Sequence, residues 1–161
     1  MSNPIPASDI RAYIADHMTS VFETMLAMKA SPSVENTAVE FTNERMSGSV
    51  GFAGKTITGS LYLHISEPFA RQATSAMLGL PLEEVTNPAE VNDVMGEITN
   101  MLGGGLKSWF CDRDAACVLT TPSVIRGTSF AVIANASIEV VQVAFDSGTM
   151  RGLVEVHVKF Q

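Results

Sequence analysis

The chain has 161 residues, enough for one domain with a sizeable core, and 46% of them are hydrophobic, as in an ordinary globular protein. Its formal net charge is −7 and it has no cluster of Lys and Arg, which argues against a nucleic-acid partner because phosphate binding needs a basic surface. No apolar run reaches the length of a transmembrane span, and the N-terminus lacks the pattern of a signal peptide. We therefore expect a single cytoplasmic domain over residues 1–161, with neither nucleic acid nor membrane as a partner.

The first half of the sequence predicts a helix, three strands and a second, short helix. Residues 8–28 carry apolar side chains at helical spacing, with Ser8 as the expected N-cap. The period then changes to two over residues 37–42, 48–53 and 56–65. The links between these segments are too short for parallel crossovers, so the strands should be antiparallel. A short amphipathic helix should begin at Pro68 and end at Gly79.

The strongest helical pattern follows, over residues 90–110. One stripe of this helix is apolar and consists of Val91, Val94, Met95, Ile98, Met101, Leu102, Leu106 and Trp109. Asn87 suits the N-cap, Pro88 the first helical position and Glu90 the third. The helix should therefore begin at Pro88.

The last third predicts strands again, and part of it resembles the first half. The expected strands are residues 116–121, 129–134, 138–145 and 152–160. Residues 50–65 align without gaps on residues 143–158, with identical pairs at Val50/Val143, Phe52/Phe145, Thr56/Thr149, Gly59/Gly152 and His64/His157. If this similarity reflects duplication, each half is a long helix plus strands, and a pseudo-two-fold axis relates the halves. The first helix then corresponds to the helix over residues 90–110.

Glu97 and Asn100 are the candidate site residues. At a spacing of three they project from one helix face, roughly 60° apart around the axis and about 4.5 Å along it. A carboxylate there can accept from a cation on a partner, and a carboxamide offers a donor and an acceptor that can orient a water molecule. The alternative is an ordinary solvated helix face, on which Glu and Asn are common.

A run of three glycines lies one turn beyond Asn100 and needs an explanation. Each glycine inside a helix costs about 1 kcal/mol relative to Ala, a cost that close packing against another backbone would offset. Gly105 falls near the core side, where it could admit a neighbouring element, whereas Gly103 and Gly104 should leave room for a partner's loops. The alternative is a helix break near residue 103.

Other reactive residue types have no arrangement that indicates chemistry. His17, His64 and His157 lack close cysteines or carboxylates in metal-ligand spacing, so we expect structural roles for them and no metal site. Cys111 and Cys117 form neither a CxxC pair nor half of a zinc site, and two buried or semi-buried free thiols fit a reducing compartment.

Residues 97–107, with the sequence EITNMLGGGLK, resemble the E-x-x-N helix of the CheC/CheX/FliY family of chemotaxis phosphatases, and a CheX-like resemblance extends over nearly the whole chain. The resemblance extends to VFETML at residues 21–26, the Gly-rich hairpin at residues 48–65, MLG at residues 77–79 and TPSV at residues 121–124. It implies an α+β fold, a duplicated helix-plus-antiparallel-strands unit with the helices packed on an antiparallel sheet.

The resemblance also implies an enzyme that hydrolyses the aspartyl phosphate of a CheY-like response-regulator receiver domain. Glu97 would pair with the receiver's lysine and Asn100 would orient the attacking water. The chain would have no cofactor of its own, because the Mg²⁺ would belong to the receiver. Asp93, Gly104 and Lys107 would contact the partner without catalytic roles.

The number of sites follows from a comparison of the two long helices. CheC proteins carry E-x-x-N on both, whereas residues 23–26 of this chain read ETML, with Leu in place of Asn. We therefore predict one active site per chain, as in CheX, and a homodimer by family analogy. The competing interpretation is a non-catalytic receiver-binding or scaffold module of the same fold, similar to the middle domain of the flagellar switch protein FliM, which lacks the Glu and Asn pair.

Overall fold

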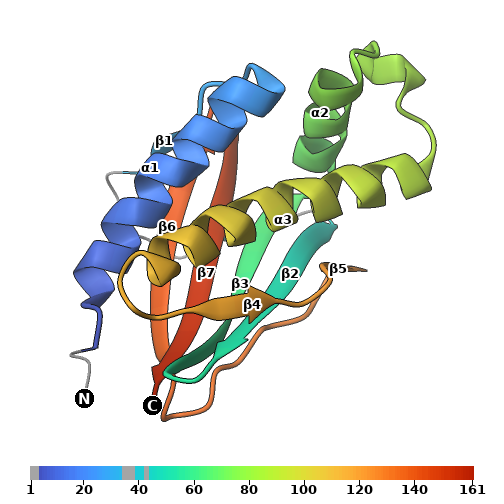
Figure 1. Ribbon diagram of the computed structural model, residues 1–161. Helices are drawn as coiled ribbons and strands as arrows, with labels where there is room; N and C mark the ends of the chain where they lie inside the picture. Colours follow the sequence, from blue (N-terminus) through green and yellow to red (C-terminus); the bar gives the residue numbers. More distant parts are fainter. Residues whose placement is uncertain (1–3, 34–38, 42–43) are drawn as a thin grey trace.

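The computed structural model describes residues 4–33, 39–41 and 44–161. Three α-helices lie on one face of an antiparallel sheet, and α1 and α3 run across its strands (Figure 1). The helices are α1 (Ala7–Leu26), α2 (Glu67–Leu78) and α3 (Pro88–Cys111), with a 3-10 turn at Leu82–Glu84. The strands are β1 (Ser31–Pro32), β2 (Arg45–Gly54), β3 (Ile57–Ser66), β4 (Cys117–Leu119), β5 (Ser123–Gly127), β6 (Glu139–Ser147) and β7 (Met150–Phe160).

The sheet has the strand order β1-β6-β7-β3-β2-β4, and β5 also pairs with β2. All of these pairs are antiparallel, as predicted. Alternate residues of the central strands face the helices, so a core of aliphatic and aromatic side chains fills the space between sheet and helices. The α+β architecture predicted from the sequence is therefore confirmed.

The N-cap of α3 and the C-cap of α2 were predicted correctly, whereas the N-cap of α1 was not. Asn87 accepts a hydrogen bond from the backbone N–H of Ala89 at 3.0 Å, and α3 continues without a break through its glycines to Cys111. Gly79 ends α2 in the left-handed conformation, with φ of 66°. Ser8, in contrast, lies inside α1, because the helix begins at Ala7 and its N-cap is Pro6.

Two predicted strands are wrong. Residues 39–41 are not in a strand, and the rest of the segment 37–42 lies outside the described residues. Residues 129–134 also form no strand; the edge of the sheet is instead formed by Ser123–Gly127, which pairs with β2. This edge strand lacks the apolar alternation of a half-buried strand, because its side chains are exposed or only partly buried.

The duplication predicted from the sequence is visible in the strand register. In the first hairpin Val50 pairs with Leu61, and in the second the equivalent residues Val143 and Val154 pair. The phenyl rings of Phe52 and Phe145 cover the equivalent glycines Gly59 and Gly152, where a β-carbon would overlap each ring. The central pairing of β3 with β7 is symmetric about the same axis, since Ser60 pairs with His157 and His64 with Leu153.

The two long helices are related by the same pseudo-two-fold axis, but not in the register predicted from the sequence. Phe110 of α3 packs on Phe52 with ring centroids 5.4 Å apart, and Phe22 of α1 packs on Phe145 at 5.2 Å. Phe22 is therefore the equivalent of Phe110. Counting back along both helices from these two phenylalanines makes Asp9 and Ala12 the equivalents of Glu97 and Asn100. The predicted equivalence between residues 23–26 and residues 97–100 is therefore wrong.

The sheet face opposite the helices contains a buried polar network rather than isolated histidines. Ser47 Oγ lies 2.6 Å from His64 Nδ1, and His64 Nε2 donates to Glu155 at 2.8 Å. Gln142 donates to the same carboxylate at 3.0 Å, and His157 Nε2 lies 3.4 Å from it. Burial alone would raise the pKa of Glu155, but the hydrogen bonds from these side chains outweigh it and lower the pKa to about 2.

This network predicts a pH-dependent contribution to stability. Because the pKa of Glu155 is lowered in the folded state, its contribution is fully present above the ordinary glutamate pKa and disappears as the pH falls from about 5 towards 2. We expect Glu155→Gln to remove this part of the acid-induced loss of stability. Denaturant unfolding between pH 3 and pH 7 would measure it, with Glu139→Gln on the exposed part of β6 as control. Parallel pH profiles for wild type and Glu155→Gln would contradict the assignment.

Candidate functional site

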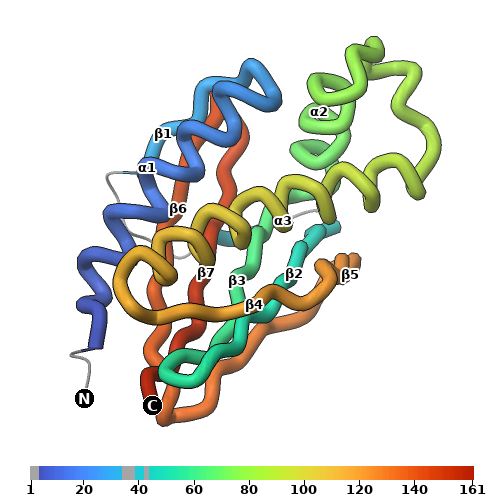
Figure 2. Tube along the Cα trace, viewed as in Figure 1, coloured from blue at the N-terminus to red at the C-terminus, as the bar shows by residue number. Residues whose placement is uncertain are grey.

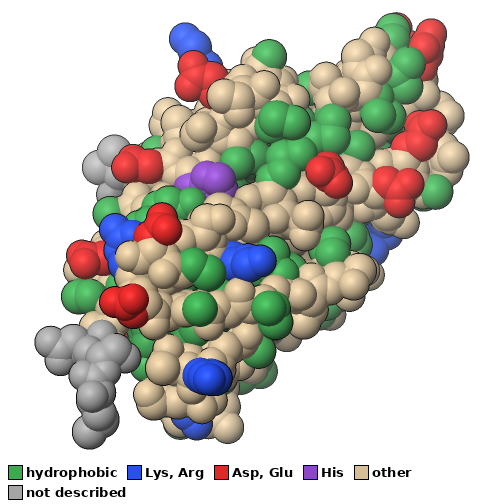
Figure 3. All heavy atoms as spheres, in the orientation of Figure 1, with side chains coloured by type: hydrophobic (Ala, Val, Ile, Leu, Met, Phe, Trp, Pro, Cys, Tyr) green, Lys and Arg blue, Asp and Glu red, His purple; other side chains and the backbone are tan. Residues whose placement is uncertain are grey.

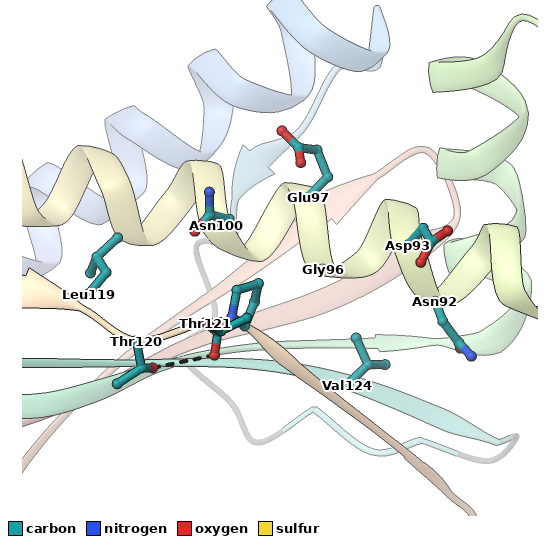
Figure 4. Close-up of a pocket in the computed structure, with 10 residues that line it drawn as sticks. Asn92, Asp93, Gly96, Glu97, Asn100, Leu119, Thr120, Thr121 and Val124 are labelled. Carbon is teal, nitrogen blue, oxygen red and sulfur yellow. Dashed lines mark hydrogen bonds between the residues drawn. The ribbon is translucent and has the colours of Figure 1, made fainter.

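A groove with a volume of about 820 Å³ lies between α3 and the segment that joins β4 to β5. One wall is the polar stripe of α3, and the other is formed by residues 119–124 (Figure 4). The lining residues are Asn92, Asp93, Gly96, Glu97, Asn100, Leu119, Thr120, Thr121, Pro122 and Val124. The groove thus contains both residues that the sequence singled out.

Glu97 and Asn100 are exposed on one face of α3, while their neighbours Ile98, Thr99 and Leu102 are buried. Within the described part of the chain, no side chain forms an ion pair or hydrogen bond with the Glu97 carboxylate or the Asn100 carboxamide. In Figure 4 Glu97 projects from the side of the helix away from Thr120 and Thr121. Both polar groups are therefore available to a partner.

Long-range pairing holds the opposite wall in place. Leu119 pairs with Phe52 of β2, and Val124 pairs with Gly48 of the same strand. Between them, Thr120 accepts a hydrogen bond on Oγ1 from the backbone N–H of Gly51 at 2.8 Å and donates its own N–H to the Gly51 carbonyl at 2.9 Å. The wall is thereby fixed to the strand on which α3 packs.

The three consecutive glycines of α3 have three different surroundings. A β-carbon at Gly105 would overlap the imidazole ring of His17, so this glycine admits α1, as predicted. A β-carbon at Gly103 would lie 2.6 Å from Cγ1 of Val50, so Gly103 is buried against the sheet and the prediction that it makes room for a partner is wrong. Gly104 has no neighbouring atom within 4 Å of the corresponding position, which leaves it open to solvent.

The predicted partner contacts divide into two groups. Asp93 is exposed and lines the groove with Glu97 and Asn100. Gly104 and Lys107 are partly exposed further along α3 and do not line the groove. Sequence reasoning missed Gly96, which has open space in place of a side chain, although its position one turn before Asn100 could have indicated it.

The pseudo-two-fold axis relates this groove to a second one, of about 380 Å³, between α1 and the β1–β6 edge. The second groove is lined by Ala12, Pro32 and Ser33, the equivalents of Asn100, Leu119 and Thr120. The pairings support these equivalences, since Ser33 N donates to Ala144 O just as Thr120 N donates to Gly51 O. Ala12 occupies the position of Asn100 in the α1 groove, so α1 has no counterpart of the Asn100 carboxamide. One active site per chain stays a prediction, now argued from Ala12 instead of Leu26.

In the described part of the chain, no group of three His, Cys, Asp or Glu side chains is arranged to hold a metal ion. Among the described helices, none is both long and apolar enough to cross a membrane. The groove offers a free carboxylate and a free carboxamide, which suit binding a cation and orienting a water molecule.

A duplicated α+β fold with one polar groove beside its second long helix is the class of protein that these features define. The family model described as "Chemotaxis phosphatase CheX" matches residues 46–146 of the sequence, which is more than half of the chain. This chain belongs to the CheX family of chemotaxis phosphatases.

Solved structures have the same fold over nearly the whole chain. Chemotaxis protein CheX from Vibrio vulnificus matches with a TM-score of 0.79 and 23% identity, covering 97% of this chain and 100% of the other. A CheC-like superfamily protein from Shewanella SP. PV-4 matches with a TM-score of 0.78 and 26% identity, covering 94% and 97%. A chain of the CheX-CheY-BeF3-Mg+2 complex from Borrelia burgdorferi matches with a TM-score of 0.71 and 18% identity, covering 97% and 99%. No curated protein matches the sequence.

Proposed function

We propose that this protein hydrolyses the aspartyl phosphate of a CheY-like receiver domain, with Glu97 and Asn100 of α3 as its working side chains. The observation that carries the proposal is that these two side chains are exposed, unpaired and three residues apart over a groove, in a chain of the CheX family. An ordinary solvated helix face would also leave both side chains exposed, so it is the groove beside them and the family match that favour a working pair.

In this proposal Glu97 holds the receiver. Its carboxylate forms a charge-assisted hydrogen bond with the receiver's lysine ammonium group, an interaction that strengthens as the interface excludes water. The exposed Asp93 and the partly exposed Glu90 add negative charge along the same side of α3. Acidic side chains are prominent on this side of the molecule in Figure 3, which suits a partner that presents a cation.

Asn100 performs the positioning step. Its carbonyl oxygen accepts a hydrogen bond from a water molecule and orients a lone pair of the water oxygen towards phosphorus. The water forms the new P–O bond, and the bond between phosphorus and the aspartyl oxygen breaks. The aspartate leaves as a carboxylate, and inorganic phosphate takes the oxygen and both protons of the water. Phosphoryl transfer of this kind depends mainly on positioning and charge stabilisation, so a carboxamide is sufficient.

The metal and the oligomeric state complete the proposal. Mg²⁺ belongs to the receiver, in agreement with the composition of the Borrelia complex, which contains CheY, BeF3 and Mg+2. The homodimer stays a prediction, which sedimentation equilibrium over a range of protein concentrations would test.

The experiment is a phosphate-release assay with phosphorylated receivers from the same organism. The protein, at one tenth of the receiver concentration, is expected to release phosphate from at least one receiver over several turnovers per molecule. If every receiver that it binds decays at its own unassisted rate, the enzyme assignment is wrong and the scaffold interpretation replaces it.

A further inference from the structure

Thr99 lies between the two proposed working residues and fits into a notch in the sheet. Its side chain is fully buried against Gly48 of β2, and its hydroxyl donates to the Met95 carbonyl at 2.7 Å within α3. A β-carbon at Gly48 would overlap the Thr99 hydroxyl oxygen and lie 2.9 Å from the Thr99 β-carbon. Only glycine at position 48 therefore lets α3 approach β2 this closely.

The same strand residue also contacts the far wall of the groove. Gly48 pairs with Val124 of β5 on one side and with Leu63 of β3 on the other. One turn along α3, Gly103 makes a second close contact, with Val50. These two contacts lie on either side of Asn100 along the helix. Together they fix how closely this part of α3 approaches β2, and therefore where Asn100 lies relative to residues 119–124.

The duplicated half provides an internal control. The equivalents of Gly48 and Thr99 are Val141 and Arg11, and the equivalent of Gly103 is Ala15. Val141 is buried, but Arg11 is exposed and its Nε reaches the Gln142 carbonyl at 3.5 Å, so no side chain of α1 enters a notch there. A helix can thus pack on this sheet without the notch. The notch occurs in the half that carries Asn100.

We infer that Gly48 and Thr99 are positioning residues, which seat α3 on β2 at the depth that Asn100 needs to orient its water. This inference rests on the proposed function, because it assigns the two residues to the chemistry of the same site. Neither residue contacts the substrate, since Thr99 is buried and Gly48 lies beneath it. Their effect must therefore pass through the placement of the helix.

The test compares Gly48→Ala, Thr99→Ala and the double variant. Gly48→Ala should lift α3 and lower kcat for the phosphorylated receiver about tenfold, since displacement of a positioning group by 1 Å can cost about a hundredfold. The KM should change less than threefold. Thr99→Ala should lower kcat severalfold, because the notch at Gly48 is then empty. The double variant should recover part of the kcat lost in Gly48→Ala, because it lacks the Thr99 hydroxyl that would overlap the new methyl group.

Gly152→Ala is the matched control. It introduces the same methyl group into the same sheet, under Phe145 in the duplicated half, and should lower thermal stability without altering kcat. A second readout needs no activity: the side-chain amide resonances of Asn100 should shift in Gly48→Ala and Thr99→Ala and stay unchanged in Gly152→Ala.

The outcomes separate the two claims. If Asn100→Ala abolishes activity but Gly48→Ala and Thr99→Ala leave kcat and the Asn100 amide resonances unchanged, the positioning role is wrong and the proposed function stands. If the resonances shift as expected while Asn100→Ala is as active as wild type, the notch positions Asn100 but the proposed function fails. If Gly152→Ala lowers kcat as much as Gly48→Ala, both glycines act only through stability, and the inference is overturned.

Discussion

Replacing Asn100 with Ala is expected to reduce receiver dephosphorylation at least about a hundredfold while leaving receiver binding within about threefold of wild type. The reason is that the carboxamide is assigned only to the water, so its loss removes a positioning contribution that operates in the chemical step. The side chain is exposed and has no partner among the described residues, so its removal should not disturb the fold.

Quench-flow kinetics under saturating protein would measure the chemical step, and titration of the BeF3-loaded receiver would measure binding. Loss of binding and of rate in the same proportion would contradict this assignment, because Asn100 would then hold the receiver rather than its water. Asn100→Gln provides a further comparison, since it keeps the carboxamide but moves it by one methylene group and should recover little activity.

Replacing Glu97 is expected to have the opposite signature. Glu97→Gln should weaken binding of the phosphorylated receiver about tenfold to a hundredfold, because a charge-assisted hydrogen bond in a desolvated interface contributes about 1.5–3 kcal/mol. Glu97→Lys should weaken receiver binding further, because it places a second ammonium group beside the receiver's lysine. The chemical step in the residual complex should be less affected than in Asn100→Ala.

Isothermal titration of each variant against the same receiver at two salt concentrations would measure this effect. Glu90→Gln is a suitable control, since Glu90 is partly exposed near the start of the same helix but does not line the groove. An equal loss of affinity in Glu90→Gln and Glu97→Gln would indicate a diffuse electrostatic effect and no specific contact with Glu97.

Local signals allowed α3 and its working face to be predicted from the sequence. The Asn87 cap, the proline after it and a long apolar stripe all indicate the same helix, and a helix of known register determines which side chains are exposed together. Exposure of Glu97 and Asn100 follows from that register alone. The continuity of α3 through its three glycines is explained only by the structure, in which Gly105 packs against α1 and Gly103 against β2.

The second wall of the groove could not be predicted in the same way, because it depends on pairing between residues far apart in the chain. Thr120 is placed by backbone contacts with Gly51, and the strand after it has too few apolar residues to be recognised. The apolar stretch at residues 129–134 predicts a strand that does not form, and Ile133 is 86% exposed. Alternation of side chains indicates that a segment can pair, but not which segment reaches the edge of the sheet.

The register between the duplicated helices shows the same limitation. Glu23 resembles Glu97 locally, but the contacts of Phe22 and Phe110 with equivalent strand residues give the true alignment. Both helices lie over the strands in Figure 2, and only their contacts with those strands show which residues of α1 and α3 are equivalent. Asp9 and Ala12 therefore could not be identified as the counterparts of the site from the helices alone.

The most direct test of the central claim is phosphate release from one phosphorylated receiver with wild type, Asn100→Ala and Asn92→Ala in parallel at equal concentration. Asn92 is an exposed asparagine on the same helix and in the same groove, so it controls for the loss of a carboxamide there. We predict that wild type and Asn92→Ala accelerate release equally and that Asn100→Ala falls to the receiver's own rate. Equal acceleration by wild type and Asn100→Ala would contradict the account.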